Sequence, residues 1–357
     1  MSFLDKNIIS FSPKVFGLDL SDLSIKVFQL EREGKEDKIR SFASVELPLG
    51  NIDDGKIINK DKVVEAVKEA VKKAVPKKIN TTKVICSIPE SKAFLRIINI
   101  PKMGEGEAGE AIKWEMEANI PLPIEEVYFD WQFLKSDPSA EKQSVLTVAV
   151  SKGIVDDLVE VLEKAGLDVY GLELESVATV RSLMEESGTE SALIVDIGAQ
   201  RTSLIITEGE VPYFTSSIAF SSENLSDAIA KDLKLERKEA ENAKINYGIH
   251  NFNDGNPVFD SIESLLENLI MEISRTIDFY NEVSKKSTGI EKIILCGGGA
   301  NMKGLVPYLA KRLDKEIYMG NPWTNLNFGN NLPIVNKADS VRYSTAVGLA
   351  LRGLHYD

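Results

Sequence analysis

The feature that most constrains the fold is a three-strand pattern that occurs twice in the chain. In the first copy, short apolar strands are predicted at 15–20, 25–30 and 41–47. In the second copy, they are predicted at 192–197, 202–207 and 211–218. The first strand of each copy carries an aspartate at its end, Asp19 or Asp196, and a turn of small or polar residues follows. A repeated unit of this kind predicts two related α/β lobes, each built on its own sheet.

The segments that follow each copy predict further elements. A helix from residue 61 should stop at Pro76, and the range 81–168 has the mixed strand and helix pattern of an inserted α/β module of its own. After the second copy, we expect helices at 222–232, 237–247 and 261–282, a buried strand at 292–296 and a last helix at 344–353. An exposed loop is expected at 330–339.

Charge and hydropathy limit the classes of partner. The formal net charge is −13, from 42 Lys and Arg against 55 Asp and Glu. A surface of this sign argues against nucleic acid or anionic lipid as the main ligand. No apolar run reaches the roughly 18–20 residues that a membrane span needs, and the first residues lack the pattern of a secretion signal. We therefore expect a cytoplasmic protein that meets a membrane only through a partner.

Two aspartates and a glycine triplet predict a phosphate site. Asp19 and Asp196 each precede a turn whose backbone N–H groups could hold phosphate, while the carboxylates could hold hydrated Mg²⁺. Gly297, Gly298 and Gly299 follow the buried strand and precede a helix, where glycine lets the backbone approach a ligand. Either aspartate alone could be an ordinary turn residue, but two at equivalent points of a repeat favour a shared ligand.

These segments resemble the actin, Hsp70 and sugar-kinase ATPase superfamily. GLDLSDLSIK (17–26) and IVDIGAQRTSLII (194–206) are similar to its two phosphate motifs, and ILCGGGANMKGL (294–305) is similar to its adenosine motif. GLELESVATVRSL (171–183) and AENAKINYG (240–248) are similar to its connecting helix and its nucleoside-facing helix. The resemblance implies a duplicated RNase H-type fold that binds ATP or ADP with Mg²⁺. It implies that Glu175 orients the attacking water and that Asp196 shares the catalytic role. The metal would be held by Asp19 and Asp196, and the implied nucleotide contacts are Asp19, Ser21, Ser24, Lys26, Asp196, Gly198, Ala199, Thr202, Glu241, Lys244, Gly297, Gly298 and Gly299.

Three further segments narrow the resemblance to the PilM family of actin-like type IV pilus assembly proteins, relatives of the division protein FtsA. They are AIKWEMEANIPLPIEEVYFDWQFL (111–134), SRTIDFYNE (274–282) and AVGLALRGL (346–354). The resemblance implies an FtsA-type subdomain IC in place of actin's IB. The implied subdomains are IA at 1–80 and 169–188, IC at 81–168, IIA at 189–221 and 290–357, and IIB at 222–289.

The same resemblance implies a partner. The N-terminal cytoplasmic peptide of PilN would bind in a groove between IA and IC and hold the protein at the inner membrane. The apolar residues of 114–123 are expected near that groove, with Trp114, Ile120 and Leu122 as the partner contacts. A core role for Trp114 is the alternative. Contacts with other pilus motor or platform proteins, and a homo-oligomer, are further possibilities that the sequence leaves open.

Departures from the superfamily pattern predict slow or absent ATP hydrolysis. Ser21 stands where a glycine is usual, and Asp22 brings a negative charge into the first phosphate turn. The second turn, 198–201, holds less glycine than in fast ATPases.

Two other functions stay open at this stage. One is an FtsA-like, membrane-associated filament protein, although the ending GLALRGLHYD lacks the basic amphipathic helix expected for direct anchoring. The other is a small-molecule kinase, for which we find no motif for a catalytic base.

Overall fold

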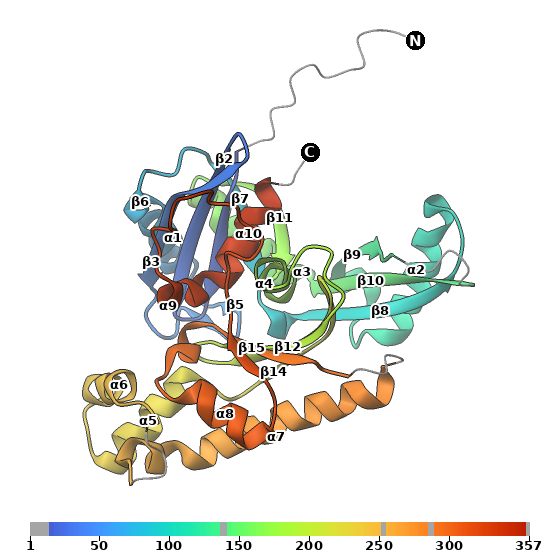
Figure 1. Cartoon of the computed structure of the whole chain (residues 1–357). Helices are drawn as coiled ribbons and strands as arrows, with labels where there is room; N and C mark the ends of the chain where they lie inside the picture. The colour runs from blue at the N-terminus through green and yellow to red at the C-terminus, as the bar shows by residue number, and fades with distance from the viewer. Residues whose placement is uncertain (1–13, 136–140, 251–254, 285–288, 355–357) are drawn as a thin grey trace.

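The computed structural model describes residues 14–135, 141–250, 255–284 and 289–354. Two lobes lie one above the other in Figure 1, and a smaller unit projects sideways from the first lobe. The two copies of the three-strand pattern fall in different lobes. The α/β, two-lobe architecture predicted from the repeat is confirmed.

The first lobe is built on a six-stranded sheet in the order β11-β7-β1-β2-β3-β6. Helices α1 and α3 pack their apolar stripes on one face of it, and α4 and α10 cover the other face. The strands are β1 (Phe16–Ser21), β2 (Ser24–Glu33), β3 (Glu36–Glu46), β6 (Val75–Pro76), β7 (Lys83–Ile88) and β11 (Asp168–Leu174). The helices are α1 (Lys60–Lys73), α3 (Lys152–Lys164), α4 (Glu175–Leu183) and α10 (Ser344–Leu354).

The second lobe repeats this plan with a five-stranded sheet in the order β14-β13-β12-β15-β16. Its large core lies between one face of the sheet and helices α5, α7 and α8, and α4 contacts the other face. The strands are β12 (Ser191–Ile197), β13 (Thr202–Glu208), β14 (Val211–Ile218), β15 (Lys292–Cys296) and β16 (Ile317–Met319). The helices are α5 (Ser222–Leu233), α6 (Arg237–Asn246), α7 (Pro257–Val283) and α8 (Leu305–Leu313). In both lobes the strand that bears the aspartate pairs antiparallel with the next strand and parallel with a later one, β7 or β15.

The projecting unit is smaller than the range 81–168 predicted for subdomain IC. Its three-stranded sheet, β8-β10-β9, is covered on one face by α2 and has its own core. It comprises β8 (Ala93–Pro101), α2 (Glu105–Asn119), β9 (Val127–Phe133) and β10 (Lys142–Ser151). Strand β7 and helix α3 fall inside the predicted range but belong to the first lobe: β7 pairs with β1 and β11, and α3 packs against α1. We call β8–β10 with α2 the inserted unit; the subdomain assignments stay predictions.

Helix α2 buries one apolar stripe. Ala108, Ile112 and Met116 are spaced four residues apart and all face the core. Trp114 lies off this stripe and is 68% exposed, so its alternative reading as a core residue is wrong.

Other boundaries differ for local reasons. Helix α7 begins at Pro257, before the predicted residue 261, because the Asn256 side chain accepts hydrogen bonds from the first free N–H groups and proline suits the first turn. The loop predicted at 330–339 contains the start of the short helix α9 (Lys337–Ser340). No helix in the described ranges is both long and apolar enough to cross a membrane.

Candidate functional site

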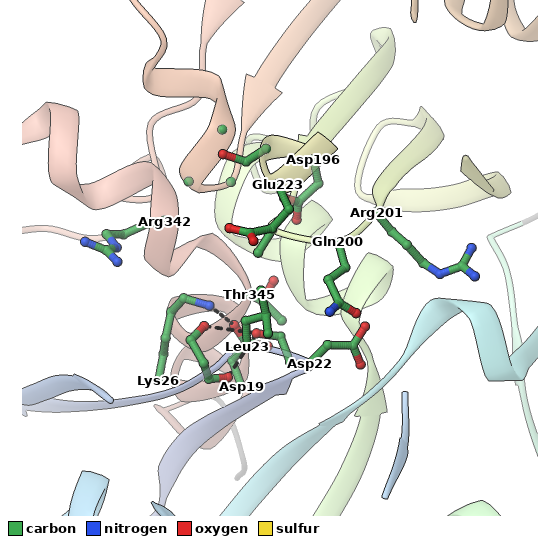
Figure 2. A pocket seen from close by; sticks show the side chains of 18 of the residues that line it. Asp19, Asp22, Leu23, Lys26, Asp196, Gln200, Arg201, Glu223, Arg342 and Thr345 are labelled. Carbon is green, nitrogen blue, oxygen red and sulfur yellow. Dashed lines mark hydrogen bonds and ion pairs between the residues drawn. The ribbon is translucent and has the colours of Figure 1, made fainter. Parts of the chain in front are cut away.

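A cavity of about 900 Å³ lies between the two lobes (Figure 2). Both repeated units contribute to its walls, as do the glycine triplet, α6 and the segment that leads into α10. The structure brings together at this cavity the predicted catalytic residues and nearly all of the predicted nucleotide contacts: Asp19, Ser21, Ser24, Lys26, Glu175, Asp196, Gly198, Ala199, Glu241, Lys244, Gly297, Gly298 and Gly299.

Asp19 is fixed at the first-lobe side of the cavity. It is 5% exposed near the end of β1, where its register partner on β2 is Lys26. Lys26 Nζ lies 2.9 Å from Asp19 Oδ2, and Ser87 Oγ donates a hydrogen bond of 3.3 Å to Oδ1. The Ser87 hydroxyl in turn accepts from Leu20 N–H at 3.0 Å, which ties β7 to the turn. Asp19 is therefore held in one orientation, with its charge opposed by a single lysine.

Asp196 occupies the equivalent place in the second lobe. Burial and the negative charge of Asp19 raise its pKa to about 6, despite the opposing effects of the Lys26 charge and a hydrogen bond with Cys296. Gly297 has φ of 82°, and a Cβ at that position would overlap the Asp196 carboxylate and lie 2.5 Å from Ile197 O. Two carboxylates that face one cavity, with Asp19 raising the pKa of Asp196, are a site in which a cation is expected to bind favourably.

Glu175 is the first residue of α4 and lies between the lobes. Burial raises its pKa well above the ordinary value, and the charges of Asp19, Glu90 and Asp196 add to that effect. The Glu175 carboxylate accepts a 3.2 Å hydrogen bond from Glu90 N–H, and the Glu90 carboxylate accepts one of 3.2 Å from Ser176 N–H. This reciprocal pair fixes the start of α4 and orients one carboxylate toward the cavity, where it could hold a water molecule.

The two predicted phosphate turns are short, and each is closed by a hydrogen bond to a backbone carbonyl oxygen. In the first, Ser21 Oγ donates to Ser24 O at 2.9 Å. In the second, Gly198 N–H bonds Arg201 O at 2.9 Å, and a Cβ at Gly198 would lie 2.8 Å from that oxygen. The turn needs glycine there because a side chain would push apart its closing hydrogen bond.

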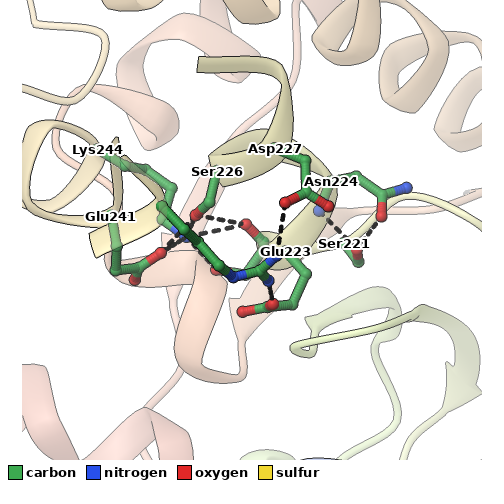
Figure 3. A network of polar contacts seen from close by, with 9 residues as sticks. Ser221, Glu223, Asn224, Ser226, Asp227, Glu241 and Lys244 are labelled. Carbon is green, nitrogen blue, oxygen red and sulfur yellow. Dashed lines mark hydrogen bonds and ion pairs between the residues drawn. The ribbon is translucent and has the colours of Figure 1, made fainter. Parts of the chain in front are cut away.

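The far end of the cavity carries a polar network on α5 and α6 (Figure 3). Lys244 Nζ donates to Ser222 O at 2.8 Å and to Ser226 Oγ at 2.8 Å, and it lies 2.7 Å from Glu241 Oε2. Ser226 Oγ also donates to the Glu241 carboxylate. Burial lowers the pKa of Lys244, although the Glu241 carboxylate opposes that change. Since Lys244 is 5% exposed and already has these partners, the more exposed Glu241 is the better placed of the two to accept hydrogen bonds from a ligand.

Some predicted site residues lie elsewhere. Thr202 is fully buried in β13 and does not line the cavity, so its prediction as a ligand contact is not supported by its position. Trp114, Ile120 and Leu122 belong to the inserted unit, far along the chain from any cavity-lining segment: Trp114 is exposed, while Ile120 and Leu122 pack against the core under α2.

Sequence reasoning missed several cavity residues, among them Glu90, Arg201, Arg342 and Thr345. Arg342 and Thr345 come from the segment at the start of α10, where the only signal was a helix pattern. In the sequence, Arg201 stands out only as a residue of the second phosphate turn that is not glycine.

The carboxylates of Asp19 and Asp196 fit a magnesium ion whose other ligands are oxygens of water and phosphate. No group of three or more His, Cys, Asp or Glu side chains among the described residues could hold a metal directly. Two carboxylates beside phosphate-sized turns match the way Mg²⁺ is usually bound, through one or two carboxylates, water and substrate phosphate.

Comparison with known proteins identifies the family. The sequence matches the family described as "Type IV pilus assembly protein PilM" over residues 17–354. A solved PilM-PilN type IV pilus biogenesis complex contains a chain that superimposes with a TM-score of 0.82 at 26% identity, covering 96% of this chain and 99% of that one. MreB5 of Spiroplasma citri, solved bound to AMPPNP, has a TM-score of 0.52 at 14% identity and 96% coverage of each chain.

Two curated relatives match over only part of their length. Cell division protein FtsA of Streptococcus pneumoniae is 25% identical over 179 residues, which are 50% of this chain and 36% of that protein. FtsA of Pseudomonas aeruginosa is 26% identical over 237 residues, 60% of this chain and 54% of that protein. The chain thus matches between about a third and a half of each FtsA. From the match over nearly its whole length, and from its actin-like two-lobe fold, this chain belongs to the PilM family of type IV pilus assembly proteins.

Proposed function

We propose that this protein is a nucleotide-binding scaffold of type IV pilus assembly, which binds Mg·ATP between its lobes and the N-terminal tail of PilN at its inserted unit. Through that tail it would be held at the cytoplasmic face of the inner membrane. The observation that carries the nucleotide part is the position of Asp19 and Asp196, which end equivalent strands and line one cavity.

The cavity residues divide into three groups with different tasks. The turns at 21–24 and 198–201 would present backbone N–H groups to phosphates, with Lys26 supplying positive charge. Glu241 would accept hydrogen bonds from sugar hydroxyls at the other end. When bound, Mg²⁺ supplies positive charge between the phosphates and the two aspartates. The AMPPNP-bound MreB5 shares the fold, which supports nucleotide as the class of ligand.

Replacing Glu175 with glutamine should separate binding from turnover. The amide keeps the shape of the side chain and can still accept from Glu90 N–H, so the affinity for Mg·ATP should stay within about threefold. Any hydrolysis should fall by about 10²-fold or more, as is typical when a group that positions a reactant in the transition state is lost. Phosphate release under single-turnover conditions measures this. Wild-type turnover near the ~10 s⁻¹ median of enzymes would show that the proposal of a slow ATPase is wrong.

For the partner, the match to a chain of the PilM-PilN complex supports PilN. Two faces of the inserted unit could receive its tail. On the α2 side, Trp114 is exposed on the helix itself, and Ile120 and Leu122 follow the end of that helix. The opposite face of the sheet packs partly on the first lobe and leaves Ile97 and Val148 half-buried near the junction. We propose Trp114 as the main anchor, because an exposed aromatic side chain offers a large contact area.

Calorimetry with a synthetic PilN tail tests the partner site. A Trp114→Ala variant should bind the tail about tenfold or more weakly, whereas Val148→Ala should bind it as the wild type does. Point variants are required, because removing 81–168 would delete β7 from the centre of the first sheet. The reverse result would place the tail at the junction with the first lobe. Absence of binding by the wild-type protein would contradict the partner proposal as a whole.

A further inference from the structure

A small hairpin connects three parts of the molecule at one aspartate. Asp54 lies at the tip between β4 (Ile52–Asp53) and β5 (Lys56–Ile57), with φ of 49°. One carboxylate oxygen lies 2.6 Å from Arg201 Nε, which belongs to the second phosphate turn in the other lobe. The other oxygen lies 2.5 Å from Lys92 Nζ, and Lys92 is the residue directly before β8 of the inserted unit. Asp54 therefore joins the second lobe to the base of the inserted unit.

The same tip is attached to the first phosphate turn. Gly55 N–H donates a hydrogen bond of 2.8 Å to Asp22 Oδ1, and Ser91 Oγ donates one of 3.3 Å to Asp54 O. Gly55 has φ of 75°, and a Cβ there would lie 2.6 Å from Pro89 Cβ, so the tip is seated closely against the start of the inserted unit. Asp22, which looked from the sequence like a charge misplaced among phosphates, is the group that holds this tip.

The ion pairs at the tip are partly shielded from water. The side chains of Asp54, Lys92 and Arg201 are 33%, 26% and 40% exposed. Burial acts to raise the pKa of Asp54, but hydrogen bonding from Lys92 and the charges of Arg201 and Lys92 bring it below its ordinary value. The carboxylate stays ionised at neutral pH, and both ion pairs persist there.

The space beside the tip is only partly filled. A cavity of about 320 Å³ lies between β8 and β14 of the second lobe, and its lining includes Asp54, Arg96, Arg201 and Thr215. The two strands also contact each other, and Glu90 hydrogen-bonds Thr215 of β14, so the ion pairs of Asp54 are one of the connections there and the one that reaches the second phosphate turn. A displacement of the second phosphate turn would move Arg201 and, through the two ion pairs, would displace Asp54 and Lys92.

We propose that the hairpin tip 53–56 is a latch that couples the two phosphate turns to the orientation of the inserted unit, with Asp54 as its joint. The coupling of PilN to ATP rests on the function proposed above, but the connection between the phosphate turns and the inserted unit through Asp54 does not. A ligand that binds the turns differently in open and closed lobes would change the orientation of the inserted unit by this route, and a partner on that unit would change nucleotide affinity by the same factor.

The first test measures the latch without any ligand. Spin labels at the exposed positions Glu110 on the inserted unit and Lys231 on the second lobe report their separation, and the buried Cys86 and Cys296 are shielded from the label. Asp54→Asn should broaden or shift the distance distribution, and Arg201→Gln should do the same from the other side of the joint. The matched control is Asp157→Asn, which removes a similarly exposed ion pair, 2.6 Å from Lys60 Nζ, between α1 and α3 of the first lobe. Distributions that are identical in the wild type, Asp54→Asn and Arg201→Gln would overturn the latch.

The second test measures the coupling. In the wild type, saturating Mg·ATP should change the affinity for the PilN tail by about fivefold or more, the lower end of typical allosteric coupling. In Asp54→Asn the ratio of the tail affinity with Mg·ATP to the tail affinity without it should fall to about one. Each ligand alone should bind within about threefold of its wild-type affinity. An unchanged ratio in Asp54→Asn would also overturn the latch. If the wild type binds no Mg·ATP, the proposed nucleotide function fails, and the distance measurement alone decides the latch.

Discussion

Replacing Asp196 with asparagine should stabilise the ligand-free protein at pH 7 and remove most of its stabilisation by Mg·ATP. The pKa of Asp196 is raised to about 6 in the folded protein by burial and by the charge of Asp19, against an ordinary value of 3.8. Each unit of such a shift corresponds to about 1.4 kcal/mol, so ionised Asp196 lowers the free energy of unfolding by about 2–3 kcal/mol at neutral pH. Asparagine has nearly the same shape without the charge.

The stability that Asp196→Asn gains over the wild type should depend on pH in a defined direction. Below about pH 4 the carboxyl is protonated in both the folded and unfolded chains, so wild type and Asp196→Asn should differ little. Between pH 4 and 6 the unfolded chain ionises while the folded protein resists ionisation, so the wild type should lose stability relative to the variant. Above pH 6 the difference should be constant. Denaturant unfolding at a series of pH values measures this.

The control is Asp278→Asn, which removes an exposed carboxylate on α7. It should change stability little at any pH and leave the effect of Mg·ATP intact. If Asp196→Asn were less stable than the wild type at pH 7, or stabilised equally by Mg·ATP, the electrostatic account of this cavity would be wrong.

Replacing Gly348 with alanine should destabilise the fold by about 2–3 kcal/mol, although alanine is the better helix former by about 1 kcal/mol. Gly348 lies in α10 where this helix crosses α4, and a Cβ there would overlap the carbonyl group of Ala178. The new Cβ is fixed to the α10 backbone and the Ala178 carbonyl group belongs to the α4 backbone, so no change of side-chain rotamer can relieve the overlap. Because α4 also packs on the second sheet, the strain would reach both lobes.

A matched substitution isolates the packing effect. Gly109 lies in α2, and a Cβ there would have nothing within 4 Å. Gly109→Ala should therefore stabilise the protein by about 0.5–1 kcal/mol through helix propensity alone. Thermal and denaturant unfolding of the two variants should give changes of opposite sign. Stabilisation by both would mean that α4 and α10 are not in close contact.

The parts of this fold that could be predicted from sequence are those set by local pattern and repetition. Asp19 and Asp196 recur at equivalent places, and antiparallel pairing with the next strand brings each to the same edge of its sheet. Gly297 and Gly298 follow a buried strand, a position where glycine lets the backbone approach a ligand closely. The antiparallel pairing of β1 with β2 and of β12 with β13 follows from these local patterns.

What could not be predicted depends on contacts between distant segments. Strand β7 looks, in sequence, like the start of the inserted unit, and only its parallel pairing with β1 and β11 shows that it belongs to the first lobe. Glu90 is an ordinary polar residue after a strand until the fold buries it against the start of α4. Asp22 appeared unfavourable because its partner, Gly55, lies 33 residues away.

Titration of nucleotide-free protein with Mg·ATP by calorimetry tests the central claim most directly. We expect one binding site, with affinity reduced about tenfold or more when Mg²⁺ is omitted or when Asp19 is replaced by alanine. In a parallel melt with Mg·ATP at about 100 times its Kd, the wild type should gain about 2.7 kcal/mol of stability. Absence of binding heat and of any shift in Tm at millimolar Mg·ATP, in protein shown to be folded and free of nucleotide, would contradict the account of this cavity as a nucleotide site.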